Sequence, residues 1–494
     1  MGKSRVYSLK EQVGYLFSGK VFALLIQMLL SLILVRLIDK EAYGVYLQLL
    51  FISQLLVTIL SFSIPASLYF FYPNAKEQLG QLISQTFFAT VGIGLLFLLL
   101  YYFFGHNLDY FFKNKVFSTF FYALGSLVVF TTITTLLEHL FVVEKKSNYV
   151  VYYNVLFTGF RVLFLICSFL IFRSILAMIW ALVVFQFLNS VFLFIYLREN
   201  YSISLNIKNW SKTYFLQQLK YVIPLGISNT INIIGKQSQR IFLSVFFSSS
   251  DFAVYSIANF KVPIINLLFP SVSNVIVPQI SKNRADGNSK EVVRLWHKMI
   301  VVLSMVTFPT VIYFVFIAEP LITFLFTNQY VSAADIYRIL MLSMLTLNLR
   351  GTTIIMAYGY TNLILYSQIA YMILSVIVGY FLIRTYGLYG AAVTFVSLNF
   401  LREFAFIYMS KLILKLSFYR WMPWKKTSRL FLISAIPAPF LLIIINSELP
   451  KFVLLIISFL LYSGIVLTLY EKFKIIDFSK IVILIKERVR VRDR

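Results

Sequence analysis

The sequence predicts an all-α integral membrane protein with about fourteen transmembrane helices. Of its 494 residues, 60% are hydrophobic and only 13% are charged, and the mean hydropathy is +0.84. A soluble domain would carry about a quarter charged residues. Apolar runs of about twenty residues, each long enough to cross a bilayer, recur between polar breaks along the chain. Lys and Arg gather in alternate connections, a pattern typical of segments that face the cytoplasm.

The apolar runs define the expected spans in order, because each is bounded by charged or turn-forming residues. The first six are 13–35, 43–70, 79–104, 116–141, 149–172 and 174–197. The next six are 222–246, 252–279, 298–318, 333–357, 362–383 and 387–410. Two further spans follow at 429–446 and 451–470.

The charge distribution supports an even number of spans. The formal net charge is +25, from 44 Lys+Arg against 19 Asp+Glu. Basic clusters such as those at 282–298, 411–429 and 472–494 fall on one side of the predicted topology, and few cations fall on the other. One missed helix would invert every later connection. We therefore expect both termini in the cytoplasm.

Two matched motifs indicate an internal duplication. An aromatic residue, a small residue, Val and Tyr begin the second helix of each half, at 43–46 and 252–255. Each copy is followed by a Pro-x7-Pro pair: Pro65 and Pro73, then Pro270 and Pro278. Because an even number of helices separates the copies, the two halves share one orientation, as in parallel-repeat transporters. The expected architecture is therefore two six-helix lobes in a parallel pseudo-repeat, plus two C-terminal helices.

The spans and the repeat suggest a division of the chain. We expect an N-terminal lobe at 1–197, a cytoplasmic linker at 198–221, a C-terminal lobe at 222–412, two additional helices at 413–470 and a basic cytoplasmic tail at 471–494. The linker has the composition of an amphipathic interfacial helix. The tail either lies on the anionic inner leaflet or serves only to set topology.

Several cations lie inside the expected spans, where an unpaired charge costs several kcal/mol. They are Lys20, Arg161, Lys236, Arg240, Lys261, Arg338, Arg350 and Arg402. Only Glu138 and Glu403 lie well inside the spans to balance them. The cations therefore cannot all be structural ion pairs, and most should face a hydrated cavity or an anionic guest.

A phosphate-bearing guest fits this cationic interior, because Arg offers a bidentate fork and Lys a point charge. Lys236 and Arg240 are four residues apart and share a helix face. The candidate substrate-binding residues are Lys20, Arg161, Lys236, Arg240, Lys261, Arg350, Arg402, Asn229 and Asn232. Three alternatives stay open: snorkelling for Lys20, a structural ion pair for Arg402, and hydrogen bonds between helices for the two asparagines.

A second group of residues is expected to shape hairpins and bends. It comprises Arg36, Gly44, Pro65, Pro224 and Pro270. The prolines could act as moving bends or as static ones. The sequence has no P-loop, and its three histidines are scattered, so we expect no cofactor, no bound metal and no enzymatic activity.

Four segments resemble, in order, signatures of one transporter family. They are Arg36-Leu37 with the Tyr-Gly-Val-Tyr of 43–46, then 220–228, 278–282 and 386–392. The chain is identified by them as a member of the polysaccharide transporter family within the multidrug/oligosaccharidyl-lipid/polysaccharide (MOP) exporter superfamily. The second hairpin departs from the pattern by carrying Ala253 where the family has Gly.

The resemblance implies a MATE-like fold and a Wzx-type flippase. Such a protein moves undecaprenyl-pyrophosphate-linked oligosaccharide units from the inner to the outer leaflet of the bacterial cytoplasmic membrane, by alternating access, for O-antigen, capsule or other surface polysaccharide. The expected partners are this lipid-linked oligosaccharide and membrane lipids, with a polysaccharide polymerase and a chain-length regulator as candidates, and no nucleic acid.

Three rival interpretations stay open. A flippase for peptidoglycan lipid precursors fits both the cationic interior and the fourteen helices. A multidrug or cation antiporter of the same superfamily would be expected to have an acidic cavity. A membrane enzyme such as an oligosaccharide polymerase or ligase would be expected to have a large outer loop.

Overall fold

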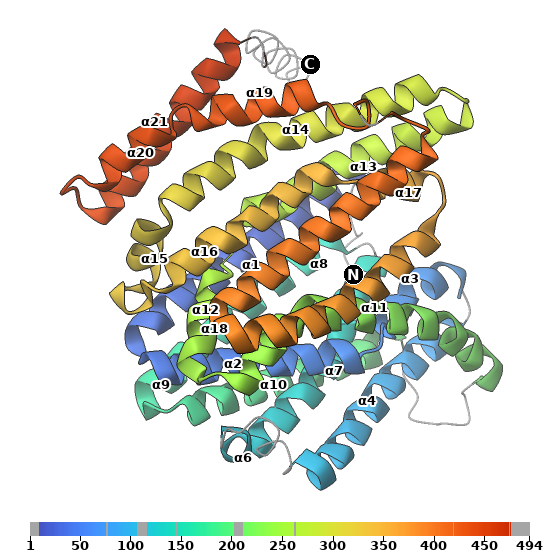
Figure 1. Ribbon diagram of the computed structural model, residues 1–494. Coiled ribbons are helices and arrows are strands. Elements are labelled where there is room, and N and C mark those ends of the chain that lie inside the picture. The colour runs from blue at the N-terminus through green and yellow to red at the C-terminus, as the bar shows by residue number, and fades with distance from the viewer. Residues whose placement is uncertain are drawn as a thin grey trace, which may run out of the picture. The chain divides into compact units, whose positions relative to one another are not determined.

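The computed structural model describes residues 9–75, 78–105, 116–144, 146–201, 211–260, 263–417, 419–473 and 475. Every element in these ranges is helical, as the sequence predicts (Figure 1). By packing, the chain divides into two compact units. Unit 1 lies within 1–256 and 368–391, and unit 2 lies within 257–367 and 392–494. The lobes expected from the repeat are a different division and stay a prediction.

The described helices include ten that are long and apolar enough to cross a membrane. One of them, α18 (Thr361–Ile413), contains two of the expected spans. Three expected spans have no such helix within the described residues. Of these, 13–35 contains a shorter apolar helix at Val21–Leu37, 222–246 lies in α11 (Lys212–Phe246), and 252–279 is divided between α12 (Ser249–Ala258) and α13 (Pro263–Ala285). The protein is therefore a multi-pass membrane protein.

Unit 1 is built mainly from the N-terminal helices. Its elements are α1 (Leu9–Leu37), α2 (Lys40–Leu60), η1 (Pro65–Ser67), α3 (Leu68–Phe71), η2 (Tyr72–Asn74), α4 (Leu79–Phe104), α6 (Val116–Thr119), α7 (Phe121–Val143), α8 (Ser147–Tyr152), η5 (Tyr153–Phe157), α9 (Thr158–Phe172), α10 (Ile175–Tyr201), α11 (Lys212–Phe246), most of α12 (Ser249–Ala258) and the 368–391 part of α18. Helix α7 packs against α2, α4 and α10. Its Leu136 and Leu140 are fully buried in a core that α7 shares with α3, α4 and α10.

The two hairpin motifs begin their helices in the same way. Asp39 caps α2 by accepting a hydrogen bond from the backbone N of Ala42. Ser248 occupies the equivalent position before α12, and its hydroxyl accepts from the backbone N of Asp251. Such side chains satisfy the free N–H groups of a first helical turn. The motif prolines differ, because Pro65 lies in a break after α2 whereas Pro270 lies inside one continuous helix.

Unit 2 contains the remaining elements. They are α13 (Pro263–Ala285), α14 (Ser289–Phe316), α15 (Ala318–Phe326), η7 (Asn328–Tyr330), α16 (Ala333–Leu342), η8 (Ser343–Leu349), α17 (Thr352–Ala357), the 392–413 part of α18, α19 (Trp424–Ala435), α20 (Ala438–Ile445) and α21 (Lys451–Lys472). The C-terminal helices α19 to α21 pack along α14 (Figure 1). Buried hydroxyls join them, since Tyr470 bonds to Ser434 at 2.9 Å and Tyr313 to Ser458 at 3.1 Å.

Helix α18 is two helices joined at Gly387. This glycine has φ +59° and ψ −132°, which are not helical values. The left-handed half of the map is open to glycine and costly for other residues. The break lies at the first residue of the expected span 387–410 and separates it from the expected span 362–383.

Candidate functional site

Helix α11 carries four of the predicted site residues on one stripe. Asn229, Asn232, Lys236 and Arg240 are spaced by three or four residues, so their side chains project from one side of the helix. Asn229 and Lys236 are exposed, and Asn232 and Arg240 are partly buried. The stripe combines two cations with two amides, the groups that suit an anionic and hydroxylated guest.

The adjoining face of α11 is fixed by packing against α18 within unit 1. Ser238 and Gln239 are buried and bond to the Ser375 hydroxyl, each at 2.8 Å. A Cβ on Gly235 would lie 3.1 Å from the Cα of Met372, so the two helices approach closely there. These contacts hold α11 in a rotation that keeps Lys236 and Asn229 exposed.

Arg240 is held between aromatic rings at the junction of α2, α11 and α12. Its guanidinium carbon lies 4.2 Å from the ring centre of Phe51 and 5.4 Å from that of Phe252. Its Nε is buried and has no hydrogen-bond partner within the described parts of the chain. Ring faces attract a guanidinium by up to about 2 kcal/mol when the pair is desolvated. The sequence predicted the cation but not these aromatic contacts.

Polar contacts tie other predicted residues of unit 1 to the helices around them. Asn229 donates a hydrogen bond at 3.2 Å to Ser63, in the break after α2, as the open alternative of a bond between helices predicts. Arg161, on α9, is partly buried and interacts electrostatically with Tyr46 of the first hairpin motif. The interaction with Tyr46 does not join Arg161 to the α11 stripe.

Unit 2 brings two further predicted residues together. Arg350 follows η8, and Arg402 lies on α18, yet both meet the carboxylate of Glu403. Glu403 Oε1 lies 3.5 Å from Arg350 Nη1 and 3.6 Å from Arg402 Nη2. The ion pair that was the open alternative for Arg402 is therefore present, and it is shared with Arg350.

A break in the helical path presents Arg350 to Glu403. The η8 segment ends at Leu349, and α17 begins only at Thr352. Side chains of other helices satisfy the backbone carbonyls of the break, as Trp296 donates to the Arg350 carbonyl at 3.2 Å and Ser410 donates to the Gly351 carbonyl at 2.8 Å. Non-helical backbone inside a membrane needs such partners.

Gly351 is required for this approach. A Cβ at this position would lie 2.3 Å from the carbonyl carbon of Phe406 on α18. No real side chain tolerates that distance, so only glycine lets the break lie against α18. The contact at Phe406 thereby places Arg350 beside Glu403, which lies about one helical turn before Phe406 on α18.

The other predicted residues are less informative. Lys261 lies outside the described residues, and so do the side chains of Lys20 on α1 and Pro270 on α13. Arg36 is exposed, and its guanidinium donates to the Leu32 carbonyl. Helix α11 continues through Pro224 without ending. Arg338 pairs with Asp335 and lies 3.9 Å from Glu319, so it belongs to a polar cluster at the start of α16.

Glu144 centres a network that the sequence did not reveal. Its buried carboxylate, at the end of α7, accepts hydrogen bonds from Tyr196 and Tyr201 on α10 and pairs with Lys146 at 2.7 Å. Tyr201 also bonds to Tyr72 of η2 at 3.1 Å. In the sequence, Glu144 is followed by two lysines, and the predicted topology alone explains them. Tyr196 and Tyr201 lie far along the chain from Glu144, so the sequence does not indicate that they contact it.

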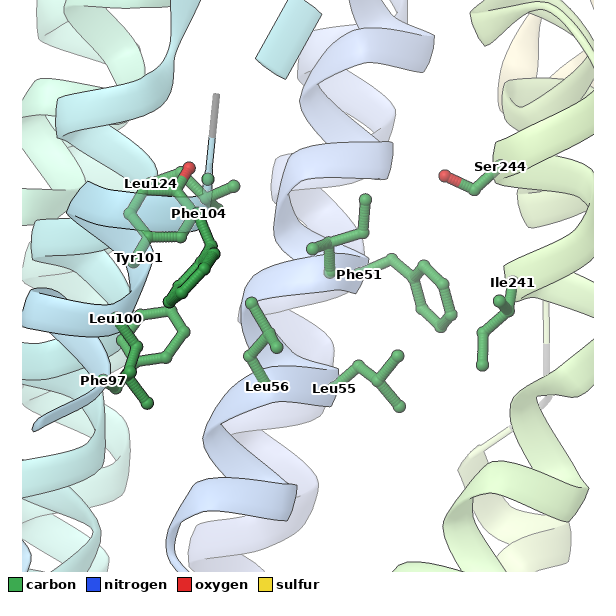
Figure 2. Close-up of a pocket in the computed structure, with 12 residues that line it drawn as sticks. Phe51, Leu55, Leu56, Phe97, Leu100, Tyr101, Phe104, Leu124, Ile241 and Ser244 are labelled. Carbon is green, nitrogen blue, oxygen red and sulfur yellow. The ribbon is translucent and has the colours of Figure 1, made fainter. Parts of the chain in front are cut away.

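An apolar cavity of about 380 Å³ lies between α2, α4, α7 and α11 in unit 1. Figure 2 shows Phe51, Leu55 and Leu56 of α2 between the aromatic side chains of α4 and residues of α11. Ser244 contributes a hydroxyl, but Gln48 already donates to that oxygen at 2.6 Å. Such walls suit hydrocarbon and offer little to a sugar or a phosphate. The α11 stripe is therefore the better candidate for polar recognition in this unit.

A family model of polysaccharide biosynthesis proteins matches residues 33–335, which include the first hairpin, the α11 stripe and α14. The chain belongs to this family. A relative within polysaccharide biosynthesis is the capsular polysaccharide biosynthesis protein CapF of Staphylococcus aureus, which is 25% identical over 417 residues. That alignment covers 81% of this chain and 99% of CapF.

Solved structures show which fold this member of the polysaccharide biosynthesis family adopts. The lipid II flippase MurJ in its inward closed conformation matches with a TM-score of 0.75 at 14% identity, over 93% of this chain and 98% of MurJ. An inward-facing multidrug resistance MATE transporter of the MOP superfamily matches with a TM-score of 0.57 at 13% identity, over 80% and 94% of the two chains. These likenesses show the fold alone, and they confirm the predicted all-α, MATE-like fold.

Proposed function

We propose that the protein is a flippase for lipid-linked oligosaccharides in polysaccharide biosynthesis. It would move undecaprenyl-pyrophosphate-linked repeat units from the inner to the outer leaflet of the bacterial cytoplasmic membrane, with both termini in the cytoplasm. The observation that carries the proposal is the stripe of Lys236, Arg240 and two asparagines on α11 of a multi-pass membrane protein that belongs to the polysaccharide biosynthesis family. A pyrophosphate needs cations, and sugar hydroxyls need amides.

Transport fits these features better than catalysis does. The predicted cations are spread over several helices, among them α9, α11 and α18. The polyprenyl part of the substrate is itself soluble in hydrocarbon, so only the polar head needs a path. Alternating access of a parallel-repeat fold supplies such a path without a chemical step. A multidrug exporter of cations would instead require carboxylates where this chain has Lys and Arg.

The same chemistry admits one rival substrate, a peptidoglycan lipid precursor. The observation that favours it is the extent of the fold match to a protein described as a lipid II flippase. The family match and the relation to CapF favour a polysaccharide repeat unit instead. A polysaccharide polymerase and a chain-length regulator stay candidate partners.

Deletion and complementation test the proposal in cells. A deletion strain should lose its surface polysaccharide and accumulate lipid-linked repeat units, and the wild-type gene should restore both. Lys236→Ala, Arg240→Ala and Arg161→Ala should each fail to restore polysaccharide while the protein stays in the membrane. Lys220→Ala is the matched control, because Lys220 is an exposed lysine of α11 outside the expected span.

Three results would contradict the proposal. Normal polysaccharide in all three single variants would remove the role of the cations. Altered drug resistance with intact polysaccharide in the deletion strain would favour the exporter. An arrest of peptidoglycan synthesis that MurJ relieves would instead identify the rival substrate.

A further inference from the structure

Glu403 lies beneath two arginines that are themselves partly accessible. The exposed fraction of its side chain is 2%, against 22% for Arg350 and 16% for Arg402. Both guanidiniums approach the same carboxylate oxygen, at 3.5 and 3.6 Å. A strong charge-assisted hydrogen bond would be about 2.7–2.9 Å long. The carboxylate thus holds both cations loosely, from the buried side.

We propose that Glu403 is a positioning residue that the pyrophosphate of the substrate replaces as partner of Arg350 and Arg402. The inference rests on the proposed function and extends it to a second polar site, in unit 2. A pyrophosphate carries more charge and more acceptor oxygens than one carboxylate, so it would displace Glu403 from the exposed side. When the guest leaves, Glu403 recovers both cations, which avoids unpaired charge within the membrane.

The surrounding contacts suit such an exchange. Asn399 accepts a hydrogen bond from Arg402 Nη2 at 3.0 Å, and this bond does not involve Glu403. Arg350 is fixed through its backbone, because Trp296 binds its carbonyl and Gly351 lies against α18. Both arginines therefore keep their places while their anionic partner changes.

The exchange makes binding and transport respond in opposite directions to one substitution. In Glu403→Gln the internal competitor is gone, so the purified full-length protein should bind inorganic pyrophosphate about tenfold more tightly, a change of ~1.4 kcal/mol. In proteoliposomes the same variant should move a lipid-linked oligosaccharide at least about threefold more slowly, because release becomes harder. A merely structural role would not produce this split.

Two further variants complete the test. Glu138→Gln removes the other carboxylate that lies well inside the expected spans, and it should leave pyrophosphate affinity unchanged. If Glu403→Gln is too unstable to purify, Glu403→Asp takes its place. It keeps the charge but shortens the side chain by one methylene, so it should raise the pyrophosphate affinity by a smaller factor than Glu403→Gln would. Unchanged or weaker pyrophosphate binding by the purified Glu403 variants would overturn the proposal.

The outcomes separate this inference from the function on which it rests. Tighter binding in Glu403→Gln together with no lipid-linked oligosaccharide movement by the wild type would support the exchange site and contradict the flippase. Movement by a wild type that binds no pyrophosphate, with Arg350→Ala and Arg402→Ala equally active, would leave the flippase standing and overturn the exchange site.

Discussion

Gly44 lies directly against the backbone carbonyl of Ser249. A Cβ built on Gly44 would lie 1.9 Å from that oxygen. Gly44 belongs to the first hairpin motif, and Ser249 is the first residue of the helix that carries the second. Gln48, one turn further along α2, extends the contact by accepting from the Ser249 hydroxyl at 3.2 Å. Within unit 1 the first motif copy therefore packs against the start of the helix that carries the second copy. This close approach explains why the first copy has a small residue at position 44.

Replacing Gly44 by Ala should destabilise the protein strongly. The added methyl group would meet backbone rather than a movable side chain, so the helices would have to separate, at a cost of about 3 kcal/mol or more. Thermal unfolding in detergent measures the effect. Gly92→Ala is the control, because Gly92 has open space around it and should gain up to about 1 kcal/mol from the helix propensity of Ala. Equal melting temperatures for both variants would contradict the close approach.

Replacing Glu144 by Gln should loosen the end of α7. The buried carboxylate accepts from two tyrosines and pairs with Lys146, and Gln cannot accept at both positions or balance the charge. We expect a loss of about 2 kcal/mol, since one partner is partly exposed. The control Glu291→Gln breaks an exposed pair with Arg294 and should change stability by no more than about 0.5 kcal/mol. A larger effect in the control than at Glu144 would be inconsistent with the network.

Arg240 and Lys236 should differ in their tolerance of exchange. Arg240→Lys keeps the charge but loses the planar stacking on Phe51 and Phe252, so polysaccharide output should fall by about tenfold. Lys236→Arg keeps an exposed cation and should retain most of the output. Quantified surface polysaccharide in the complemented deletion strain decides the matter. The aromatic contacts would have no role if both exchanges were equally tolerated.

Gly387→Ala should strain the break in α18. The residue has φ +59° and ψ −132°, a region that glycine adopts readily and where another residue costs about 1–3 kcal/mol. The variant should therefore unfold at a lower temperature and lose transport in proportion. Gly464→Ala, in the open surroundings of α21, serves as the control and should melt at or above the wild-type temperature. A Gly387 variant as stable as that control would indicate that the break adapts to a continuous helix.

Much of the fold could be predicted because the hydrocarbon interior of a membrane restricts which backbone structures can cross it. A chain in lipid must satisfy its backbone internally, so apolar length and basic connections indicate helices and their direction. The motif comparison indicated the helices that begin near 43 and 252, but the N-caps at Asp39 and Ser248 come from the structure. The break at Arg350 could not be predicted, because its carbonyls are satisfied by Trp296 and Ser410, which are remote in sequence.

The candidate site was predictable as chemistry but not as geometry. Helical spacing places Lys236 and Arg240 on one face, which the structure shows. Nothing in the spacing indicates that Arg240 stacks on Phe51, or that Arg350 and Arg402 share Glu403. Such contacts depend on which helices become neighbours, and hydropathy carries no information about that choice.

Movement of the substrate across a bilayer tests the central claim most directly. The purified protein is reconstituted in proteoliposomes with an undecaprenyl-pyrophosphate-linked oligosaccharide, and the fraction of oligosaccharide accessible to an external glycosidase is followed over time. The proposed function predicts that wild type and Lys220→Ala expose the internal pool, and that Lys236→Ala does so at least about tenfold more slowly. A wild-type rate no higher than that of Lys236→Ala or of protein-free liposomes, or movement of lipid II alone, would contradict it.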